Sequence, residues 1–294
     1  MTPYEEQISR IAQQVAKGEC ILFLGAGVHA PPPEGSRYLY PETDRPPLGG
    51  TLSRHLAAKC NFQLTFPKES DTNLQRVSFC FELQEGRSRN DLVKEIDRLV
   101  NIDKKPSPIL RGLAALNFPL IITTNYDQLF EQALYGVGKS PFITHYNKDP
   151  FVPTTDYMDP TERRPFLFKI HGDIGHPESI VITDEDYIDF VLRMSDKDPL
   201  NPVPETFRFF FKKWPTLFLG YSLLDYNLRL LFKTLRWKVD KANMPVTFSV
   251  DPSPDVLIVK VYSSQQSYVT FIVQDVWTFA PELYKKVVDK EMPQ

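Results

Sequence analysis

The sequence CILFLGAG (residues 20–27) is a run of hydrophobic side chains that ends in a glycine turn. Two later stretches end in a comparable way, PLIITTNYD (119–127) and FLFKIHGD (166–173). In an open α/β sheet, ligands bind in the crevice outside the carboxyl ends of the strands. Because glycine or polar clusters follow each of these apolar strands, the sequence predicts one shared nucleotide site at the strand ends.

The order of the predicted elements favours one fold class. Apolar strands alternate with helical stretches, which is typical of βαβ units and a parallel sheet. We expect further strands at residues 216–220, 246–250, 256–261 and 268–273. We expect helices at residues 3–17, 126–136, 184–194, 204–213, 225–238 and 281–290. The predicted fold is therefore α/β, with a Rossmann-like, doubly wound and mostly parallel sheet.

The length of 294 residues suits one large domain with a smaller part inserted into it. Residues 28–50 are rich in proline and glycine, which predicts a long loop. Helical periodicity resumes at residue 51, and residues 72–117 read as helices throughout. We predict one domain over residues 1–294, with a small helical subdomain inserted at 51–117.

Composition limits the classes of partner and metal. A net charge of -3 gives no global attraction to nucleic acid or to an anionic membrane. No stretch approaches the roughly 20 apolar residues that span a bilayer, so we expect a soluble, cytoplasmic protein. The three cysteines are too few for a four-cysteine zinc ribbon. The acidic run at 184–186 reads as the solvated start of a helix, so we predict no bound metal.

The glycine turn at residues 25–30 satisfies the pattern G-x-G-x-x-A, which is a fingerprint of dinucleotide-binding dehydrogenases. That fingerprint needs a helix that begins at the glycines and binds the pyrophosphate. Three prolines follow at once, at 31–33, and a proline run is incompatible with a helix interior. Two readings stay open: close approach of the glycine backbone to a phosphate, or a tight turn without a ligand.

Asn125 and Asp127 follow a buried strand at the start of a predicted helix. They are either functional or simply a helix cap and a favourable charge for the helix dipole. His171 also follows an apolar strand, and Gly172 beside it would let a ligand approach closely. With its near-neutral pKa, histidine is the natural general base among these groups. The other histidines, including His29, lack comparable context.

Together these segments resemble the sirtuin superfamily. The match runs in order through GAG (25–27), TNYD (124–127), HG (171–172) and GYS (220–222), and it covers nearly the whole chain. It is closer to the divergent bacterial sirtuin-like proteins of phage defence than to protein deacylases. The stretch FLGYSLLD (218–225) and the Asn-Tyr-Asp and His-Gly-Asp variants point that way.

The resemblance implies a role for each matched residue. Asn125, Asp127 and His171 would be the catalytic set, at the nicotinamide ribose of NAD. Asn125 would position the attacking water or the carboxamide, and His171 would orient a ribose hydroxyl or deprotonate the attacking group. The residues that would contact the rest of NAD are Gly25, Ala26 and Gly27 at the pyrophosphate, Thr124, and on the adenosine side Gly220, Ser222 and the weaker candidate Asp225.

Two features depart from the deacylases. The chain cannot build their four-cysteine zinc ribbon, and the loop after the glycines lacks their glycine-proline-aromatic-arginine pattern. Arg37 and Arg45 are candidates for the missing cation. The resemblance therefore implies an NAD+ hydrolase without zinc that releases nicotinamide and ADP-ribose. The alternatives are a module that binds NAD or ADP-ribose without turnover, and an NAD-dependent protein deacylase.

An uncontrolled NAD hydrolase would kill its own cell, so the activity needs a gate. The resemblance implies an effector of anti-phage defence that depletes NAD and is controlled by assembly. We expect a homo-oligomer or a partner protein, and a HerA-type ATPase suits a chain of this length better than an Argonaute-like protein. DNA would take part only indirectly, through a bound motor, and a membrane not at all.

Overall fold

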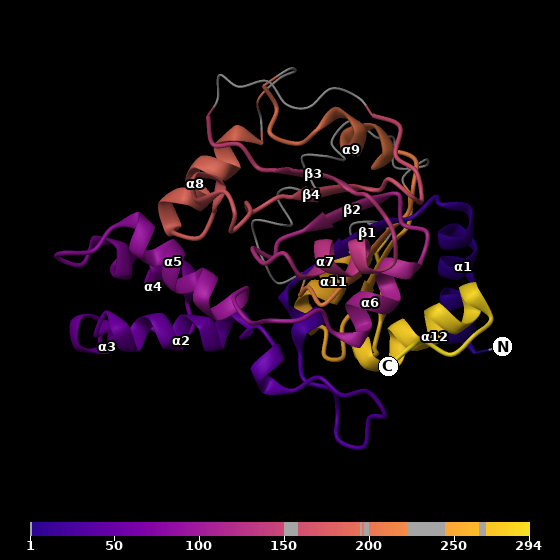
Figure 1. Ribbon diagram of the computed structural model, residues 1–294, viewed down its shortest axis with the longest axis horizontal. Coiled ribbons are helices and arrows are strands. Elements are labelled where there is room, and N and C mark those ends of the chain that lie inside the picture. Colours follow the sequence, from indigo (N-terminus) through magenta and orange to yellow (C-terminus); the bar gives the residue numbers. More distant parts are fainter. Residues whose placement is uncertain (1, 150–157, 195, 197–199, 223–244, 265–268) are drawn as a thin grey trace.

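A seven-stranded parallel sheet in the order β3-β4-β2-β1-β5-β6-β7 is the centre of the molecule. The computed structural model describes residues 2–149, 158–194, 196, 200–222, 245–264 and 269–294 (Figure 1). The strands are β1 Ile21–Leu24, β2 Leu120–Thr123, β3 Phe142–His145, β4 Phe166–Lys169, β5 Thr216–Leu219, β6 Thr247–Val250 and β7 Val269–Ile272. The predicted α/β class and parallel sheet are thereby confirmed.

Helices cover both faces of the sheet (Figure 1). They are α1 Pro3–Lys17, α2 Gly49–Lys59, α3 Phe62–Thr65, α4 Leu74–Leu83, α5 Arg89–Val100, α6 Pro108–Ala115, α7 Leu129–Gly136, α8 Asp184–Arg193, α9 Glu205–Phe210, α11 Val256–Ser264 and α12 Val276–Val288. Helices α1, α6, α7 and α12 pack on one face, where leucines of β1 and β5 point. Helices α8, α9 and α11 pack on the other, which is rich in phenylalanine. Among the described helices, none is long and apolar enough to cross a bilayer.

Helices α2 to α5, which we call the helical cluster, extend from one end of the sheet and have a core of their own (Figure 1). Leu56, Phe62 and Ile96 are fully buried in it. Tyr126 and Ile180, from the turns that follow β2 and β4, complete this core. Helix α6 packs instead on α7 and α12. The division of the chain into domains stays a prediction.

Local sequence explains where several elements begin and end. Helix α1 starts with a capping box. The Thr2 hydroxyl accepts a hydrogen bond from the Glu5 N–H, and the Glu5 carboxylate accepts one from the Thr2 N–H. Gly18 ends it in the left-handed conformation, with φ of 70°. Helix α7 begins at Leu129, later than predicted, and its N-cap Gln128 makes no side-chain cap hydrogen bond. The Asp127 side chain accepts a hydrogen bond from the Leu129 N–H over 3.0 Å, which closes a local turn just before the helix.

The predicted strand at 256–261 is wrong, since this segment is helix α11. Its β-branched residues suggested a strand, but β6 and β7 are parallel neighbours and a parallel pair needs a crossover connection, usually a helix. The short edge strand β3 was not predicted, and the loop at 28–50 follows a 3₁₀ turn at Ala26–His29. The helix predicted at 225–238 lies outside the described residues.

The carboxyl ends of β1 and β5 meet through their backbones. The Gly27 N–H donates to the Gly220 carbonyl over 2.7 Å, and the Gly25 N–H donates to the Leu219 carbonyl over 3.0 Å. Gly220 has φ of +66°, and a Cβ on it would overlap the Val28 backbone. Glycine is therefore required at this junction by both its conformation and its size.

We predict that Gly220→Ala lowers the free energy of unfolding by more than the ~1–3 kcal/mol that a left-handed conformation alone costs, because overlap with Val28 is added to the strain. Urea unfolding monitored by circular dichroism measures the difference. The matched control is Gly138→Ala, where φ is +78° and a Cβ would meet nothing within 4 Å. Equal losses in the two variants would contradict the argument.

Asp186 corrects the expectation that residues 184–186 form only a solvated helix start. Its side chain is 12% exposed and forms ion pairs with Arg89, at 2.8 Å, and with Lys148. It also accepts hydrogen bonds from the backbone N–H groups of Ile182 and Thr183. Burial acts to raise the pKa of Asp186, but the contact with Lys148 and the backbone donors outweigh it and lower the pKa. The carboxylate therefore ties the start of α8 to the start of α5.

A carboxyl group whose pKa is depressed in the fold stabilises the fold above its unfolded pKa of about 3.9 and loses that contribution as the pH falls. We expect Asp186→Asn to lower the free energy of unfolding at pH 7 by about 1.5–3 kcal/mol, the usual value of charge-assisted hydrogen bonds. The difference between variant and wild type should shrink below pH 4. A difference in unfolding free energy that is constant from pH 7 to pH 3 would refute this assignment.

Candidate functional site

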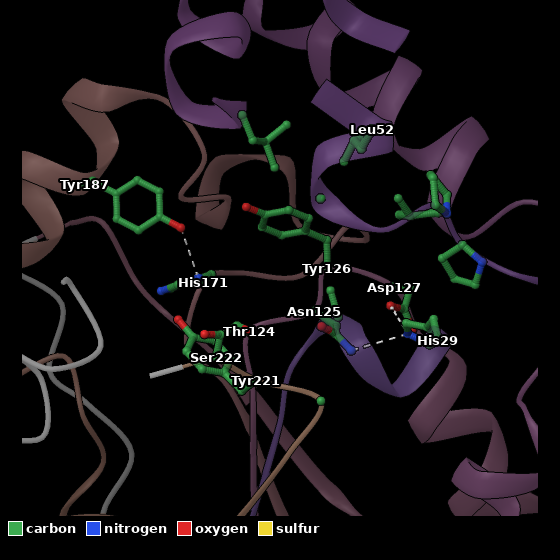
Figure 2. A pocket seen from close by; sticks show the side chains of 17 residues that line it. His29, Leu52, Thr124, Asn125, Tyr126, Asp127, His171, Tyr187, Tyr221 and Ser222 are labelled. Atoms are coloured by element: carbon green, nitrogen blue, oxygen red, sulfur yellow. Dashed lines mark hydrogen bonds and ion pairs between the residues drawn. The ribbon is translucent and has the colours of Figure 1, made fainter. Parts of the chain in front are cut away.

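A cavity of about 370 Å³ opens at the carboxyl ends of β1, β2, β4 and β5 (Figure 2). This is the point where the chain passes from one side of β1 to the other, since β2 and β5 flank β1 in the sheet. Ligand crevices of doubly wound sheets lie at such switch points. Its polar floor is formed by Thr124, Asn125, Asp127, His171 and Ser222, and its apolar wall by Pro46, Pro47, Leu52, Leu74 and Val100.

The structure brings most of the predicted site residues together. Those that line the cavity are Ala26, Thr124, Asn125, Asp127, His171, Gly220 and Ser222. Gly25 and Gly27 form the β1–β5 junction beside it. Asp225 lies outside the described residues. The tight turn that the sequence left open for the glycines is therefore present, and the roles of all these residues toward a ligand stay predictions.

Asn125 joins the ends of β1 and β2. Its backbone N–H donates to the Thr123 hydroxyl over 3.0 Å, which fixes the turn after β2. Its side-chain amide donates to the Gly25 carbonyl over 3.4 Å. The same amide nitrogen lies 3.3 Å from Nε2 of His29 (Figure 2). The Gly25 carbonyl thus holds the amide at the bottom of the cavity, next to the His29 ring.

His29 is the functional candidate that the sequence analysis missed. It is 3% exposed, and its Nε2 lies 3.1 Å from the Asp127 carboxylate. Burial acts to raise the pKa of Asp127, but the proximity of His29 and Lys169 overrides it, so the pKa is lowered. An ionised carboxylate only accepts hydrogen bonds. His29 Nε2 therefore carries a hydrogen and donates a hydrogen bond to the Asp127 carboxylate. The position of His29 within the glycine turn, two residues after Gly27, was the available signal.

Tyr40 supports His29 from the other side of the ring. Its hydroxyl lies 3.4 Å from His29 Nδ1 and donates to the Lys105 carbonyl over 3.0 Å. Burial, followed by the charge of Asp127, raises the pKa of the Tyr40 phenol far above its ordinary value. The phenol is therefore neutral at physiological pH, and its single hydrogen can be donated either to the Lys105 carbonyl or to His29 Nδ1.

His171 lies on the opposite side of the cavity floor, and its side chain is buried between two aromatic rings. Tyr187 and Phe190 both meet it edge to face, and the Tyr187 hydroxyl lies 3.4 Å from Nδ1 (Figure 2). Gly172 follows with φ of +90°, and a Cβ there would overlap the Ser179 backbone. The turn after β4 therefore needs glycine beside His171 for packing, whatever approaches the cavity.

The two arginines proposed as the missing cation differ in position. Arg37 pairs with Glu291 at 2.6 Å and with the Tyr38 hydroxyl, and it does not line the cavity. Arg45 directly precedes the cavity-lining Pro46, and its Nε is buried without a hydrogen-bond partner among the described residues. Neither arginine lines the cavity, but Arg45 lies next to a lining residue in the chain.

Groups that could hold a metal lie away from the cavity floor. The three cysteines are free. His145, His176 and Glu178 bring their ligand atoms within 4.8 Å of one another, but none of them lines the cavity. No step of the chemistry considered below is assigned to this group.

Sequence comparison relates this chain to known SIR2-like proteins. A family model described as SIR2-like domain matches residues 119–271, more than half of the chain. The chain is 25% identical over 234 residues to NAD(+) hydrolase ThsA of Acinetobacter baumannii (strain 532279), covering 78% of the chain and 42% of that protein. It is 26% identical over 239 residues to NAD(+) hydrolase ThsA of Enterococcus faecium, covering 81% of the chain and 44% of that protein.

A third relative is Defense-associated sirtuin 2 of Bacillus subtilis, which is 24% identical over 253 residues, covering 85% of the chain and 22% of that protein. The chain thus spans less than half the length of these relatives. The family match includes the turns after β2, β4 and β5 that build the cavity floor. By sheet topology, cavity position and sequence match, the chain belongs to the SIR2-like domain family.

Proposed function

We propose that the chain is an NAD+ hydrolase, which cleaves the bond between nicotinamide and ribose and releases nicotinamide and ADP-ribose. The observation that carries the proposal is the convergence of Asn125, the His29–Asp127 pair and His171 on one cavity at the switch point of the sheet. Relatives that are named NAD(+) hydrolases support the choice of substrate.

The chemistry places different demands on each group. Water attacks C1′ of the ribose as the C1′–N bond breaks, and both electrons of that bond leave with neutral nicotinamide. The transition state resembles an oxocarbenium ion. The buried Asp127 carboxylate supplies a fixed negative charge for the developing positive charge. Asn125 positions the water, and His171 orients a ribose hydroxyl or takes the proton that the water loses.

The rest of NAD would lie along the ends of β1 and β5. We assign the pyrophosphate to the backbone of residues 25–27 and to the Arg45 guanidinium, since Arg45 directly precedes the cavity-lining Pro46. Thr124 lines the same cavity floor, and we assign Gly220 and Ser222 to the adenosine side. Asp225 keeps its assignment there as a prediction only.

We expect Asn125→Ala and His171→Ala each to lower kcat for nicotinamide release by about 100-fold or more, which is the usual effect of losing a positioned donor or a general base. Chromatography of free nicotinamide measures turnover, and circular dichroism checks folding. The control is His55→Ala, because His55 pairs with Glu95 and does not line the cavity. Wild-type turnover in either active-site variant would sink the assignment.

A second experiment separates hydrolysis from the other activities that the same cavity could serve. With NAD alone, the wild-type chain should release nicotinamide and ADP-ribose in equal amounts. Calorimetric binding of NAD without release would identify a sensor module. Release that requires an added acylated peptide would identify a deacylase, because the acyl group then replaces water as the acceptor.

For the cellular role we propose anti-phage defence by depletion of cytoplasmic NAD, in line with the relative named a defense-associated sirtuin. Because such an activity must be gated, we propose control by homo-oligomer formation or by a HerA-type ATPase, with DNA acting only through that partner. Nicotinamide release measured across protein concentrations, with and without the ATPase, tests this control. Identical specific activity under all of these conditions would exclude it.

A further inference from the structure

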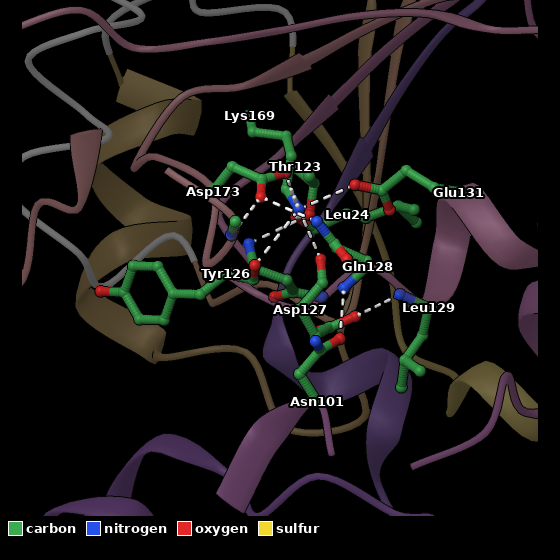
Figure 3. A network of polar contacts seen from close by, with 12 residues as sticks. Leu24, Asn101, Thr123, Tyr126, Asp127, Gln128, Leu129, Glu131, Lys169 and Asp173 are labelled. Atoms are coloured by element: carbon green, nitrogen blue, oxygen red, sulfur yellow. Dashed lines mark hydrogen bonds and ion pairs between the residues drawn. The ribbon is translucent and has the colours of Figure 1, made fainter. Parts of the chain in front are cut away.

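Lys169 is the last residue of β4 and is fully buried, with an exposed fraction of 0%. Its Nζ donates to the Asp127 carbonyl over 2.6 Å and lies 3.2 Å from the Tyr126 carbonyl (Figure 3). It also contacts the carboxylates of Glu131 and Asp173, each at 2.7 Å. The three hydrogens of an ammonium group are thus fully used inside the protein.

Stability alone does not explain this arrangement. Burying an ion pair is costly, and apolar groups of similar volume often give an equal or more stable fold. Burial acts to lower the pKa of Lys169, but the charges of Glu131 and Asp173 outweigh it and raise the pKa. Lys169 therefore stays charged, and the consequence of that charge is geometric.

The geometry concerns the two turns that carry the proposed catalytic groups. Lys169 holds the carbonyls of Tyr126 and Asp127, which lie between β2 and α7 directly after Asn125. The carboxylate of Asp173, on the turn after His171, binds the same ammonium group.

Two further contacts tie these turns together. The Ile174 N–H donates to the Tyr126 carbonyl over 3.0 Å. The other oxygen of Asp173 accepts from the Gln128 side-chain amide over 3.0 Å. A single buried cation thus lies at the centre of the connection between the Asn125 turn and the His171 turn.

We infer that Lys169, together with Asp173, is a positioning residue that fixes Asn125 and Asp127 relative to His171. Lys169 does not line the cavity, so it acts through the backbone that it holds. This inference rests on the proposed NAD+ hydrolysis for its effect on rate. Its structural part, the coupling of the two turns, is independent of that reaction.

The test uses three variants of the full chain. Lys169→Met removes the cation, and Lys169→Met/Glu131→Gln/Asp173→Asn also removes the two carboxylates that contact it, so that neither is left buried without its cation. Lys139→Met is the matched control, because Lys139 is also buried and donates to a backbone carbonyl, that of Leu116, away from the cavity. We measure kcat and KM for NAD, the melting temperature, and hydrogen exchange of the amides in residues 124–128 and 171–176.

We expect the triple variant to regain melting temperature relative to Lys169→Met, yet to keep a kcat about 10–100-fold below wild type, the usual size of an effect transmitted through a supporting residue. Hydrogen exchange should rise in both turns together, and KM should change less than kcat. Lys139→Met should lose melting temperature only.

A triple variant with wild-type kcat and unchanged exchange in the two turns would overturn the inference. If the wild-type chain releases no nicotinamide at any protein concentration, with or without the ATPase, the proposed function fails. Hydrogen exchange alone then decides the inference: joint loosening of the two turns supports it, and unchanged exchange, or loosening of one turn only, refutes it.

Discussion

The backbone contact between the ends of β1 and β5 is the constraint on which the rest of the structure depends. The Gly27 N–H and the Gly220 carbonyl approach to 2.7 Å, which leaves no room for a side chain on either residue. With β2 on its other side, β1 therefore ends at a point where three strand ends converge. The cavity exists because the chain must leave this point in two directions.

Next to the β1–β5 junction, a second constraint comes from buried charged groups. The Asp127 carboxylate contacts the His29 imidazole, the Lys169 ammonium group bonds the Asp127 backbone carbonyl, and all three side chains are almost completely buried. In such surroundings charges are weakly screened and cost little reorganisation during a reaction. The free energy that is needed to order these charged side chains is supplied by folding, so they are already in place before any ligand binds.

The sequence predicted the parts of the site that local patterns determine. Strand ends are visible as apolar runs that stop at glycine or polar residues, and this pattern suffices to predict that Asn125 and His171 lie at the cavity. It does not predict His29 and Lys169, because their partners lie 98 and about 40 residues away along the chain. The strand prediction at 256–261 is wrong for a related reason. The parallel pairing of β6 and β7 needs a crossover between them, and this requirement outweighs the strand-like composition of the segment.

The helical cluster contributes to the cavity in two ways, through its own side chains and through its contact with the turn after β2. It supplies the apolar wall of the cavity through Leu52 and Leu74, yet its core is closed by Tyr126, which stands between Asn125 and Asp127. The Tyr126 hydroxyl donates to the Val181 carbonyl over 2.8 Å, so this side chain is anchored at its far end as well. Tyr126 therefore connects the packing of the apolar wall with the placement of Asn125 and Asp127 in the polar floor.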